Sequence, residues 1–299
     1  MEKDVPVRED WLTQWYGEHR RYLLAVAYRM LGSYTEAEDI VQDVFVRLHS
    51  LNPADISQAR PFLTRMIVNR SMDVLKSARM KRVNYVGPWL PEPEVARYPE
   101  DVSDTLVHTE AVSYALLVMM ERLSPGERAV FLLHDIMGYS YPDIAAMLER
   151  TEASCRQLMS RARKKLQSDR PQDPPPLPEA RLMSERFLRA VYSGDHEQVL
   201  QWLHQQAVCF SDGGGKVHAA VRPIAGADRV AAFIIGLMSQ LQSSQVADAT
   251  LVPLIINGEL GFGVSEGGRW TTAISIAWSP EGIRYLYMVR NPDKLGQMP

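Results

Sequence analysis

The side chains best suited to chemistry lie in one segment, SYPDIAAMLERTEASCRQLMSRARKKL, from Ser140 to Leu166. Ser140 precedes Asp143 by three residues, and Thr151 is followed by Glu152, so Ser140 and Thr151 can each cap a helix. Only a tight turn separates the two predicted helices, which is the arrangement of a helix-turn-helix. Apolar or small residues fall where the helices must cross: Ile144, Ala145, Leu148, Cys155 and Leu158.

The polar edge of the second helix indicates binding to a nucleic acid. The residues predicted to face outward are Glu152, Ala153, Arg156, Gln157 and Ser160. Positive charge continues along this helix at Arg161, Arg163, Lys164 and Lys165. Positive charge beside an exposed polar edge is attracted to the phosphates that line a groove. The alternative is an ordinary helical hairpin with a solvated basic face, because Glu149 occupies the turn where glycine is usual, at a cost of about 1 kcal/mol if the residue is left-handed.

Two helices near the N-terminus carry opposite charges. The first follows Gly32 and has a complete apolar stripe: Ala37, Ile40, Val41, Val44, Phe45 and Leu48. Its exposed side carries Asp39, Gln42 and Asp43 with few basic neighbours, a pattern that is more often solvated surface than a docking site. The second helix, 61–82, has one acid, Asp73, in a basic run: Arg60, Arg65, Arg70, Lys76, Arg79, Lys81 and Arg82. Together the two helices suggest separate protein and nucleic-acid partners.

Composition limits the remaining possibilities. The chain has 299 residues, 46% hydrophobic content and a formal net charge of -3, so nucleic-acid binding requires local patches. Cys155 and Cys209 are isolated, and we expect no metal site, no cofactor and a reducing compartment. The charged N-terminus lacks an apolar core, and the apolar run 231–238 is too short to span a bilayer. We therefore expect a cytoplasmic protein without membrane contact.

Two proline-rich breaks divide the chain. The first contains Trp89 and Leu90, which we expect to pack against another part of the protein, because exposing each would cost roughly 2 kcal/mol. The predicted organisation is a first helical domain (1–85), a linker (86–104), the helix-turn-helix domain (105–168, with helices resuming near Thr105), a second linker (169–178) and a C-terminal domain (179–299).

The C-terminal domain follows a different pattern. Predicted helices cover about 179–192, 195–204 and 227–241, and predicted strands end at Ser211, begin at Val217 and cover 270–278 and 283–289. Asn257-Gly258 predicts a hairpin. The predicted fold class is thus multidomain, with two all-α domains and then an α+β cone, in which a curved antiparallel sheet wraps a helix around a cavity.

Several segments resemble a known family. EDIVQDVF (38–45), NRSMDVLKSARMKR (69–82) and the helix-turn-helix with its preceding LSPGERAVFLLHDIMGY resemble the two conserved regions of an extracytoplasmic-function (ECF) bacterial sigma factor. WLPEP (89–93), DGGGK (212–216) and NPDKL (291–295) resemble the subgroup with a SnoaL-like C-terminal extension. The resemblance implies an alternative sigma factor that directs promoter-specific transcription and is controlled by its own C-terminal domain.

The resemblance also implies roles for residues. Core RNA polymerase, through its β′ clamp helices and β flap, is the implied partner, with the clamp helices meeting Asp39, Gln42 and Asp43. The minus-ten promoter element would meet the loop 52–58 and Asn69, Arg70, Asp73, Lys76 and Arg79. The minus-35 element would meet Glu152, Arg156, Gln157, Ser160, Arg161 and Lys164, with the last two on phosphates. Regulatory contacts would involve Trp89, Leu90, Pro91, Glu92 and Pro93; Asp212, Gly213, Gly214, Gly215 and Lys216; and Asn291, Pro292, Asp293, Lys294 and Leu295.

Two other functions remain open at this stage. SnoaL-like cones include enzymes, so the chain could join an isomerase or cyclase to a DNA-binding module, with His218 or Asp212 as general base. We expect no catalytic residues, because a lone histidine on a strand is more often structural and DGGGK lacks the Ser or Thr of a nucleotide-binding loop. A ligand-sensing helix-turn-helix regulator would leave the acidic helix unexplained. The sequence leaves open whether the cone holds a small molecule.

Overall fold

The computed structural model describes residues 10–82, 84–98, 112–167, 175–243 and 249–299. The chain divides into two compact units. Unit 1 contains Met1–Val83 and Met120–Ser168, and unit 2 contains Asn84–Met119 and Asp169–Pro299. The first linker therefore belongs to the unit that holds the C-terminal domain.

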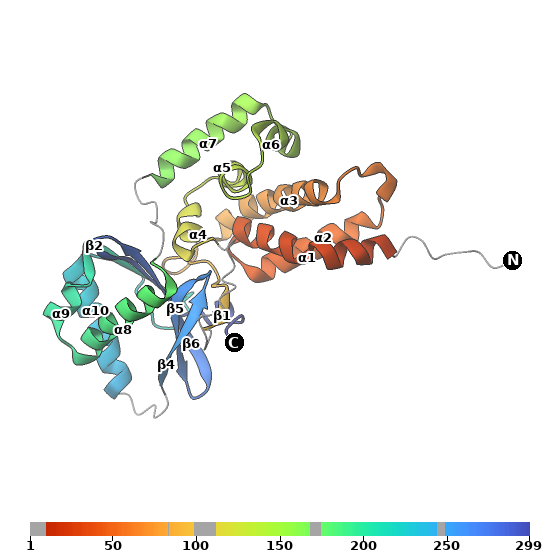
Figure 1. The fold of residues 1–299 in the computed structure, drawn as a ribbon. Coiled ribbons are helices and arrows are strands. Elements are labelled where there is room, and N and C mark those ends of the chain that lie inside the picture. Colours follow the sequence, from red (N-terminus) through yellow and green to blue (C-terminus); the bar gives the residue numbers. More distant parts are fainter. Residues whose placement is uncertain (1–9, 83, 99–111, 168–174, 244–248) are drawn as a thin grey trace. The chain divides into compact units, whose positions relative to one another are not determined.

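Unit 1 begins with three helices, α1 (Asp10–Leu31), α2 (Tyr34–Leu48) and α3 (Ala59–Arg82), with the short 3-10 turn η1 (Pro53–Asp55) between the last two (Figure 1). Gly32 has a φ of +70° and follows α1 directly, as predicted for a C-cap. Ser33 caps α2 by accepting a 3.3 Å hydrogen bond from the Glu36 N–H. The six residues predicted to form the apolar stripe of α2 are all buried. Local periodicity and capping residues thus determine this part of the fold.

The second half of unit 1 contains α5 (Pro125–Phe131), the π-helical turn η3 (Leu132–Ile136), α6 (Tyr141–Leu148) and α7 (Glu152–Leu166). Ser124 and Glu127 form a capping box at the start of α5. The π-helical turn was not predicted. The expected start of this helical region near Thr105 lies outside the described residues, and α4 (Tyr114–Met120) is the first described helix after the linker.

The two halves of unit 1 pack against each other. The Arg128 side chain is 2% exposed, and its Nε donates a 3.1 Å hydrogen bond to the Arg29 carbonyl at the end of α1. The hydroxyl groups of Tyr22 and Tyr139 lie 3.4 Å apart. Helix α3 contacts both α5 and α6. The helix-turn-helix therefore rests on the basic helix within one compact unit.

Unit 2 contains a seven-stranded sheet with the order β1-β4-β5-β6-β7-β2-β3. Its further elements are α8 (Leu177–Ser193), α9 (His196–Leu200), β2 (Leu203–Asp212), β3 (Ile224–Ala225), α10 (Ala227–Ser243), β4 (Thr250–Ile256), β5 (Glu259–Glu266), β6 (Arg269–Ser279), β7 (Gly282–Val289) and η4 (Pro292–Lys294). The predicted fold class, two helical domains followed by an α+β domain, is confirmed. Asn257 and Gly258, with φ of 51° and 78°, form the predicted hairpin turn.

Two details of the predicted sheet were wrong. β2 pairs with β7 in parallel, with Cys209 opposite Leu286, so the sheet is mixed and not purely antiparallel. Hairpin neighbours must run antiparallel, but β2 and β7 are joined by a long connection that permits either direction. The strand expected from Val217 is absent from the described residues, where the only strand between β2 and α10 is the two-residue β3.

Both faces of the sheet are covered. Helices α8 and α10 pack on one face, where Phe187, Ile234 and Leu286 belong to one apolar core (Figure 1). The opposite face has its own core, in which Leu90 of the linker and Tyr114 of α4 are buried. The linker also adds the edge strand β1 (Val95–Arg97), which pairs antiparallel with β4. This strand was not predicted, and it makes the linker part of the C-terminal domain.

Candidate functional site

The helix-turn-helix forms as predicted. Ser140 accepts a hydrogen bond from the Asp143 N–H at 3.3 Å, and Thr151 accepts one from the Ser154 N–H at 3.2 Å. Glu149 ends α6 in the left-handed region, with φ of 53° and ψ of 48°. The five residues predicted to lie at the helix crossing are all buried. The five predicted to face outward lie on the less buried side of α7 and are exposed.

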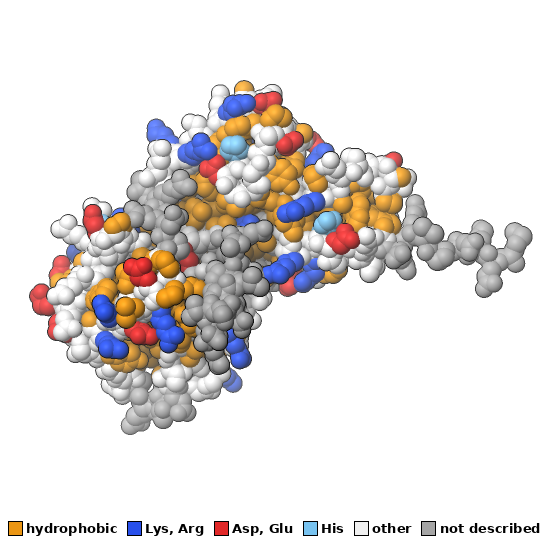
Figure 2. All heavy atoms as spheres, in the orientation of Figure 1, with side chains coloured by type: hydrophobic (Ala, Val, Ile, Leu, Met, Phe, Trp, Pro, Cys, Tyr) orange, Lys and Arg blue, Asp and Glu red, His pale blue; other side chains and the backbone are white. Residues whose placement is uncertain are grey.

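The positive charges of α7 differ in their surroundings. Arg163 pairs with Asp135 at 2.7 Å, which raises the pKa of the arginine, and Lys165 pairs with the buried Glu127 at 2.6 Å. Within the part of the chain that the structure describes, Arg161 and Lys164 have no acidic partner. Figure 2 shows basic and acidic side chains intermixed on the visible face of α6 and α7. Among the described residues, Arg161 and Lys164 are therefore the basic side chains of α7 that no acidic side chain neutralises.

Contacts within the chain orient the Arg156 side chain. Its guanidinium pairs with the Glu152 carboxylate at 3.0 Å and lies 4.6 Å from the centre of the Tyr141 ring. Both contacts orient the side chain on the exposed edge of α7. Gln157 and Ser160 are exposed beside it.

The acidic face of α2 has a basic neighbour on α3. Asp43 pairs with Arg70 of α3 at 3.2 Å, with the two side chains 52% and 37% exposed. Exposed pairs of this kind contribute about 0–1 kcal/mol, so another cation can replace Arg70. Asp39 and Gln42 are exposed on the same face.

Three of the residues named on α3, Asn69, Arg70 and Asp73, line a hollow of about 280 Å³ together with residues of α2. Lys76 pairs with Asp73 at 2.8 Å. Arg79 lies on α3, but its side chain is outside the described residues. In the nearby loop, Asn52 accepts a 3.3 Å hydrogen bond from the Ala54 N–H and caps η1.

One contact between α3 and α6 was not predicted. The Asn69 amide donates a 3.1 Å hydrogen bond to the Met147 carbonyl in α6. One turn earlier on α3, Arg65 pairs with Glu149 at 2.5 Å. Asn69 therefore cannot offer this N–H to another acceptor while its contact with α6 is in place. The sequence marked Glu149 for its unusual place in the turn, but it gave no sign that Arg65 would be its partner.

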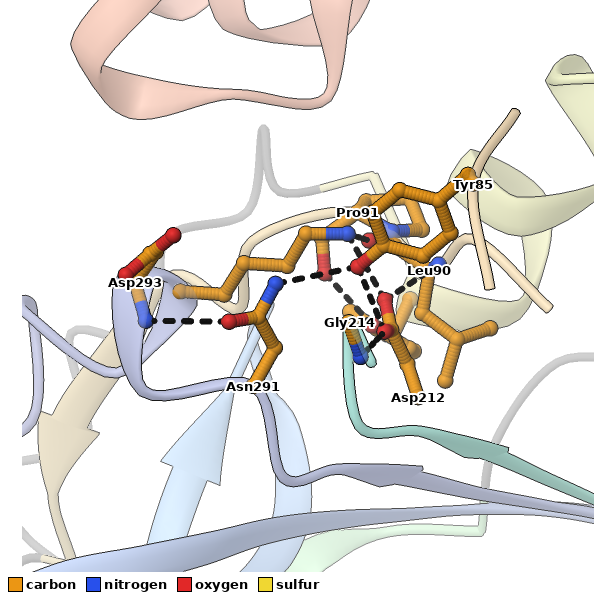
Figure 3. A network of polar contacts seen from close by, with 9 residues as sticks. Tyr85, Leu90, Pro91, Asp212, Gly214, Asn291 and Asp293 are labelled. Carbon is orange, nitrogen blue, oxygen red and sulfur yellow. Dashed lines mark hydrogen bonds and ion pairs between the residues drawn. The ribbon is translucent and has the colours of Figure 1, made fainter. Parts of the chain in front are cut away.

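A second site lies in unit 2, where the three pentapeptide segments meet (Figure 3). Its centre is Asp212, which is fully buried. One carboxylate oxygen accepts hydrogen bonds from the Tyr85 hydroxyl at 2.6 Å and the Gly214 N–H at 3.0 Å. The other accepts from the Leu90 N–H at 2.9 Å and the Lys294 ammonium at 2.7 Å. One carboxylate thus joins the linker, the glycine turn and the chain's C-terminal segment.

Lys294 completes the attachment of the linker. Its ammonium also donates a 2.6 Å hydrogen bond to the Leu90 carbonyl, so Leu90 is held through both its N–H and its carbonyl. The same ammonium lies 4.1 Å from the centre of the Trp89 ring. Leu90 is 1% exposed, which confirms that this apolar linker residue is packed. Burial and the nearby Asp212 carboxylate raise the pKa of Tyr85, so its hydroxyl stays protonated and donates.

The Asn291 side chain lies so close to the turn 212–216 that one position there must be glycine. Its amide donates a 3.0 Å hydrogen bond to the Tyr85 hydroxyl, and its oxygen accepts one from the Asp293 N–H at 3.2 Å (Figure 3). Gly214 has a φ of 61°, and a Cβ there would collide with the Asn291 side chain. Glycine is therefore required by both the backbone angle and the close approach. Lys216 extends from the turn to an exposed ion pair with Asp293.

Unit 2 also contains a cavity of about 670 Å³ between α8, α10 and the sheet. Neither His218 nor Asp212, the candidate general bases, lines it, because His218 is exposed and Asp212 is committed to the linker. Among the described residues no group of three or more His, Cys, Asp or Glu could hold a metal ion, and no helix is long and apolar enough to cross a membrane.

Comparison with known proteins agrees with this geometry. Residues 15–80 match the family Sigma-70 region 2, and residues 113–166 match Sigma-70, region 4. The chain is 34% identical over 293 residues to the ECF RNA polymerase sigma factor SigJ of Mycobacterium tuberculosis, covering 94% of this chain and 92% of that protein. It is 31% identical to the probable ECF RNA polymerase sigma factor SigI of the same species, covering 89% and 92%. The crystal structure of M. tuberculosis SigJ matches with a TM-score of 0.76 at 31% identity, covering 96% of this chain and 99% of that one.

Proposed function

This chain belongs to the extracytoplasmic-function RNA polymerase sigma factors, and we propose that its C-terminal domain controls promoter-directed transcription in cis by holding the linker between the two promoter-binding regions. As a sigma factor it binds core RNA polymerase and promoter DNA and directs where transcription starts. The observation that carries the proposal is the buried Asp212 carboxylate, whose partners include both the linker and the C-terminal segment.

The linker matters because the two regions recognise separate promoter elements. A sigma factor that reads both elements must adopt a linker path of suitable length and direction, and any contact that favours another path lowers the active population. The C-terminal domain is attached to the same chain, so its effective concentration is high and weak contacts suffice. Here the contacts include a buried ion pair and the added strand β1.

Within this cluster we assign different tasks to two segments. Residues 291–295 restrain the linker through Lys294, which bonds to Leu90, while the turn 212–216 positions the linker through Asp212. Removing the first segment should release activity, and removing both should also remove support for the linker.

The partner surfaces follow the exposed residues of unit 1. We assign Asp39, Gln42 and Asp43 to the β′ clamp helices, since their charges would repel DNA phosphates. Region 4 would contact the β flap. Base reading is assigned to Arg156, Gln157 and Ser160, phosphate contacts to Arg161 and Lys164, and minus-ten contacts to the exposed side of α3.

Sigma factors are not enzymes, and we infer that the cone has no catalytic role. Asp212 is not placed to act as a general base, because its two carboxylate oxygens accept four hydrogen bonds and it does not line the cavity. The cavity serves regulation in this proposal.

In vitro transcription with purified core polymerase tests the proposal. The full-length chain is compared with Lys294→Met and with truncations before Asn291 and before Asp212, and folding is checked by circular dichroism. Lys294→Met and the truncation before Asn291 should raise promoter-dependent transcription. The truncation before Asp212 should give less transcription than the truncation before Asn291. Lys216→Met, which removes only an exposed ion pair, is the matched control. Unchanged activity in all folded variants would refute control in cis.

A further inference from the structure

The cavity of unit 2 has the size and walls of a small-molecule site. Its volume of about 670 Å³ lies within the roughly 300–1,000 Å³ that is usual for ligand pockets. Apolar side chains from two helices and from the sheet dominate its walls, among them Phe187 on α8, Met238 on α10 and Phe262 on β5. Burying an apolar molecule there would be favourable.

One end of the cavity is polar. The neighbouring strands β5, β6 and β7 line the cavity with residues that lie side by side in rows across the sheet. In one row Phe262 pairs with Ile274, and Ile274 pairs with Met288. Two residues along, on the same face, the next row contains Thr272 and Arg290, since side chains alternate between faces with a period of two. This row, which also includes Val264 of β5, therefore gives its end of the cavity a hydroxyl and a guanidinium.

The polar row offers unused hydrogen-bond donors. Thr272 is only 4% exposed, and its hydroxyl has no partner within the described residues. Arg290 donates one guanidinium N–H to the His218 carbonyl at 2.5 Å, and its other N–H groups have no partner in that same part of the chain. An acceptor oxygen placed at this end of the cavity could receive hydrogen bonds from the Thr272 hydroxyl and from the guanidinium of Arg290, and bonds from a charged donor are the stronger kind. Glu266 also lines the cavity, but its carboxylate accepts a hydrogen bond from Thr271 at 3.2 Å.

The same arginine connects the cavity with the linker site. Arg290 bonds to the 212–218 segment twice, through its side chain to the His218 carbonyl and through its backbone N–H to the Asp212 carbonyl at 2.7 Å. The next residue, Asn291, donates its backbone N–H to the Asp212 carbonyl at 2.9 Å. A ligand that moves Arg290 thus changes the support of the residue that holds the linker.

We propose that this cavity binds an amphipathic small molecule with an apolar body and a carbonyl or carboxylate oxygen, received by Thr272 and Arg290, and that its occupancy changes the hold of Asp212 on the linker. The second half of this inference rests on the proposed control in cis. The first half, ligand binding, does not.

Binding is tested on the full-length chain without polymerase. Isothermal titration calorimetry compares decanoic acid, methyl decanoate and decylamine, all below their micelle concentrations. The acid and the ester supply an acceptor oxygen, and the relative affinity of these two probes distinguishes a carboxylate from a neutral carbonyl ligand. Decylamine supplies none and should bind at least about tenfold more weakly than the better of the two, because a cation meets Arg290.

Matched variants locate the site. Thr272→Val keeps the shape of the side chain, removes the free hydroxyl and should weaken the better probe about fivefold or more. Ser275→Ala, which removes a hydroxyl from the opposite face of β6 and outside the cavity lining, should leave the affinity unchanged. Arg290→Met should weaken the acid more than the ester. Equal binding of all three probes, or equal affinity of the parent and Thr272→Val, would overturn the site.

Coupling is tested by repeating in vitro transcription with the better probe at saturation. The probe should change promoter-dependent transcription by the parent and not by Arg290→Met. Binding without any change in transcription would overturn the coupling but leave the site. An effect of Lys294→Met on transcription without probe binding would overturn the site but leave control in cis.

Discussion

The Asp212 carboxylate and the Lys294 ammonium form an ion pair of 2.7 Å, with the two side chains 0% and 7% exposed. Lys294→Met should destabilise unit 2 by about 3–5 kcal/mol, because it leaves the buried carboxylate without its charge partner. Asp212→Asn should cost a comparable amount. Denaturant unfolding followed by circular dichroism measures both.

The double variant Asp212→Asn with Lys294→Met tests whether the loss comes from the unpaired charge. It should be less destabilised than the sum of the two single variants, since neither charge remains. Lys216→Met is the control, because its exposed pair with Asp293 contributes about 0–1 kcal/mol. Additive losses in the double variant would contradict a coupled pair.

The half-buried Glu259 predicts a pH-dependent stability. Loss of hydration raises the pKa of Glu259 from 4.5 to about 7 in the folded chain. Between these values the folded state holds a proton that the unfolded state has lost, so this contribution is complete below about pH 4.5 and disappears as the pH rises through about 7. Glu259→Gln should remove that dependence and be more stable than the parent above about pH 7. Parallel losses of stability with pH in parent and variant, measured by denaturant unfolding, would contradict it.

Local signals predicted most of the helical fold. The stripe of α2 needs only a period of 3.6, and the caps at Ser33, Ser124, Ser140 and Thr151 need only residues three positions apart. The hairpin at Asn257 likewise depends on two adjacent residues.

The parts that were missed depend on contacts between distant residues. β1 is a three-residue strand in a proline-rich linker, and it exists because the edge of β4 supplies its hydrogen bonds. The direction of β2 relative to β7 depends on the path of the long connection between them. For Asp212, only the family resemblance marked the residue, and nothing local indicated that it would be fully buried with Tyr85 and Lys294 as partners.

The contact between α3 and α6 should restrain DNA binding by the free chain. Glu149→Gly removes the ion pair with Arg65. It also removes the cost, about 1 kcal/mol, of holding a non-glycine residue in the left-handed region. The variant should be as stable as the parent or more so, and should bind minus-ten DNA more tightly because Asn69 is released more readily. Fluorescence anisotropy with a single-stranded minus-ten oligonucleotide measures the affinity.

Arg65→Gln separates the two effects, since it removes the ion pair and leaves the strained turn. It should reproduce the change in DNA affinity without the gain in stability. DNA affinities equal to that of the parent in both variants would show that the docked α6 does not compete with DNA.

Charge reversal on α2 should weaken polymerase binding and not folding. In Asp43→Lys the apolar stripe that fixes α2 is unchanged, while the face meeting the basic partner loses a carboxylate and gains a cation. Core binding measured by surface plasmon resonance should weaken at least about tenfold, because like charges would then face each other across the interface. Arg70→Gln is the control, because it removes the same ion pair and keeps Asp43. Undiminished core binding by Asp43→Lys would exclude this face as the docking surface.

Two basic residues of α7 should respond differently to promoter sequence. Arg156 is oriented by Glu152 and Tyr141 on the exposed edge of the helix, whereas Lys164 is exposed near its end. Arg156→Ala should cost about 1–3 kcal/mol at particular minus-35 positions and relax specificity there. Lys164→Ala should weaken binding to all sequences similarly and reduce the dependence of affinity on salt by about one counterion.

Lys165→Ala is the matched control, because that residue is already paired with Glu127 and should change affinity less than Lys164→Ala. Competition binding of holoenzyme to promoters substituted at single minus-35 positions, repeated at several salt concentrations, measures these effects. If Arg156→Ala and Lys164→Ala lower affinity uniformly across those promoters, the division into base reading and phosphate contact is wrong.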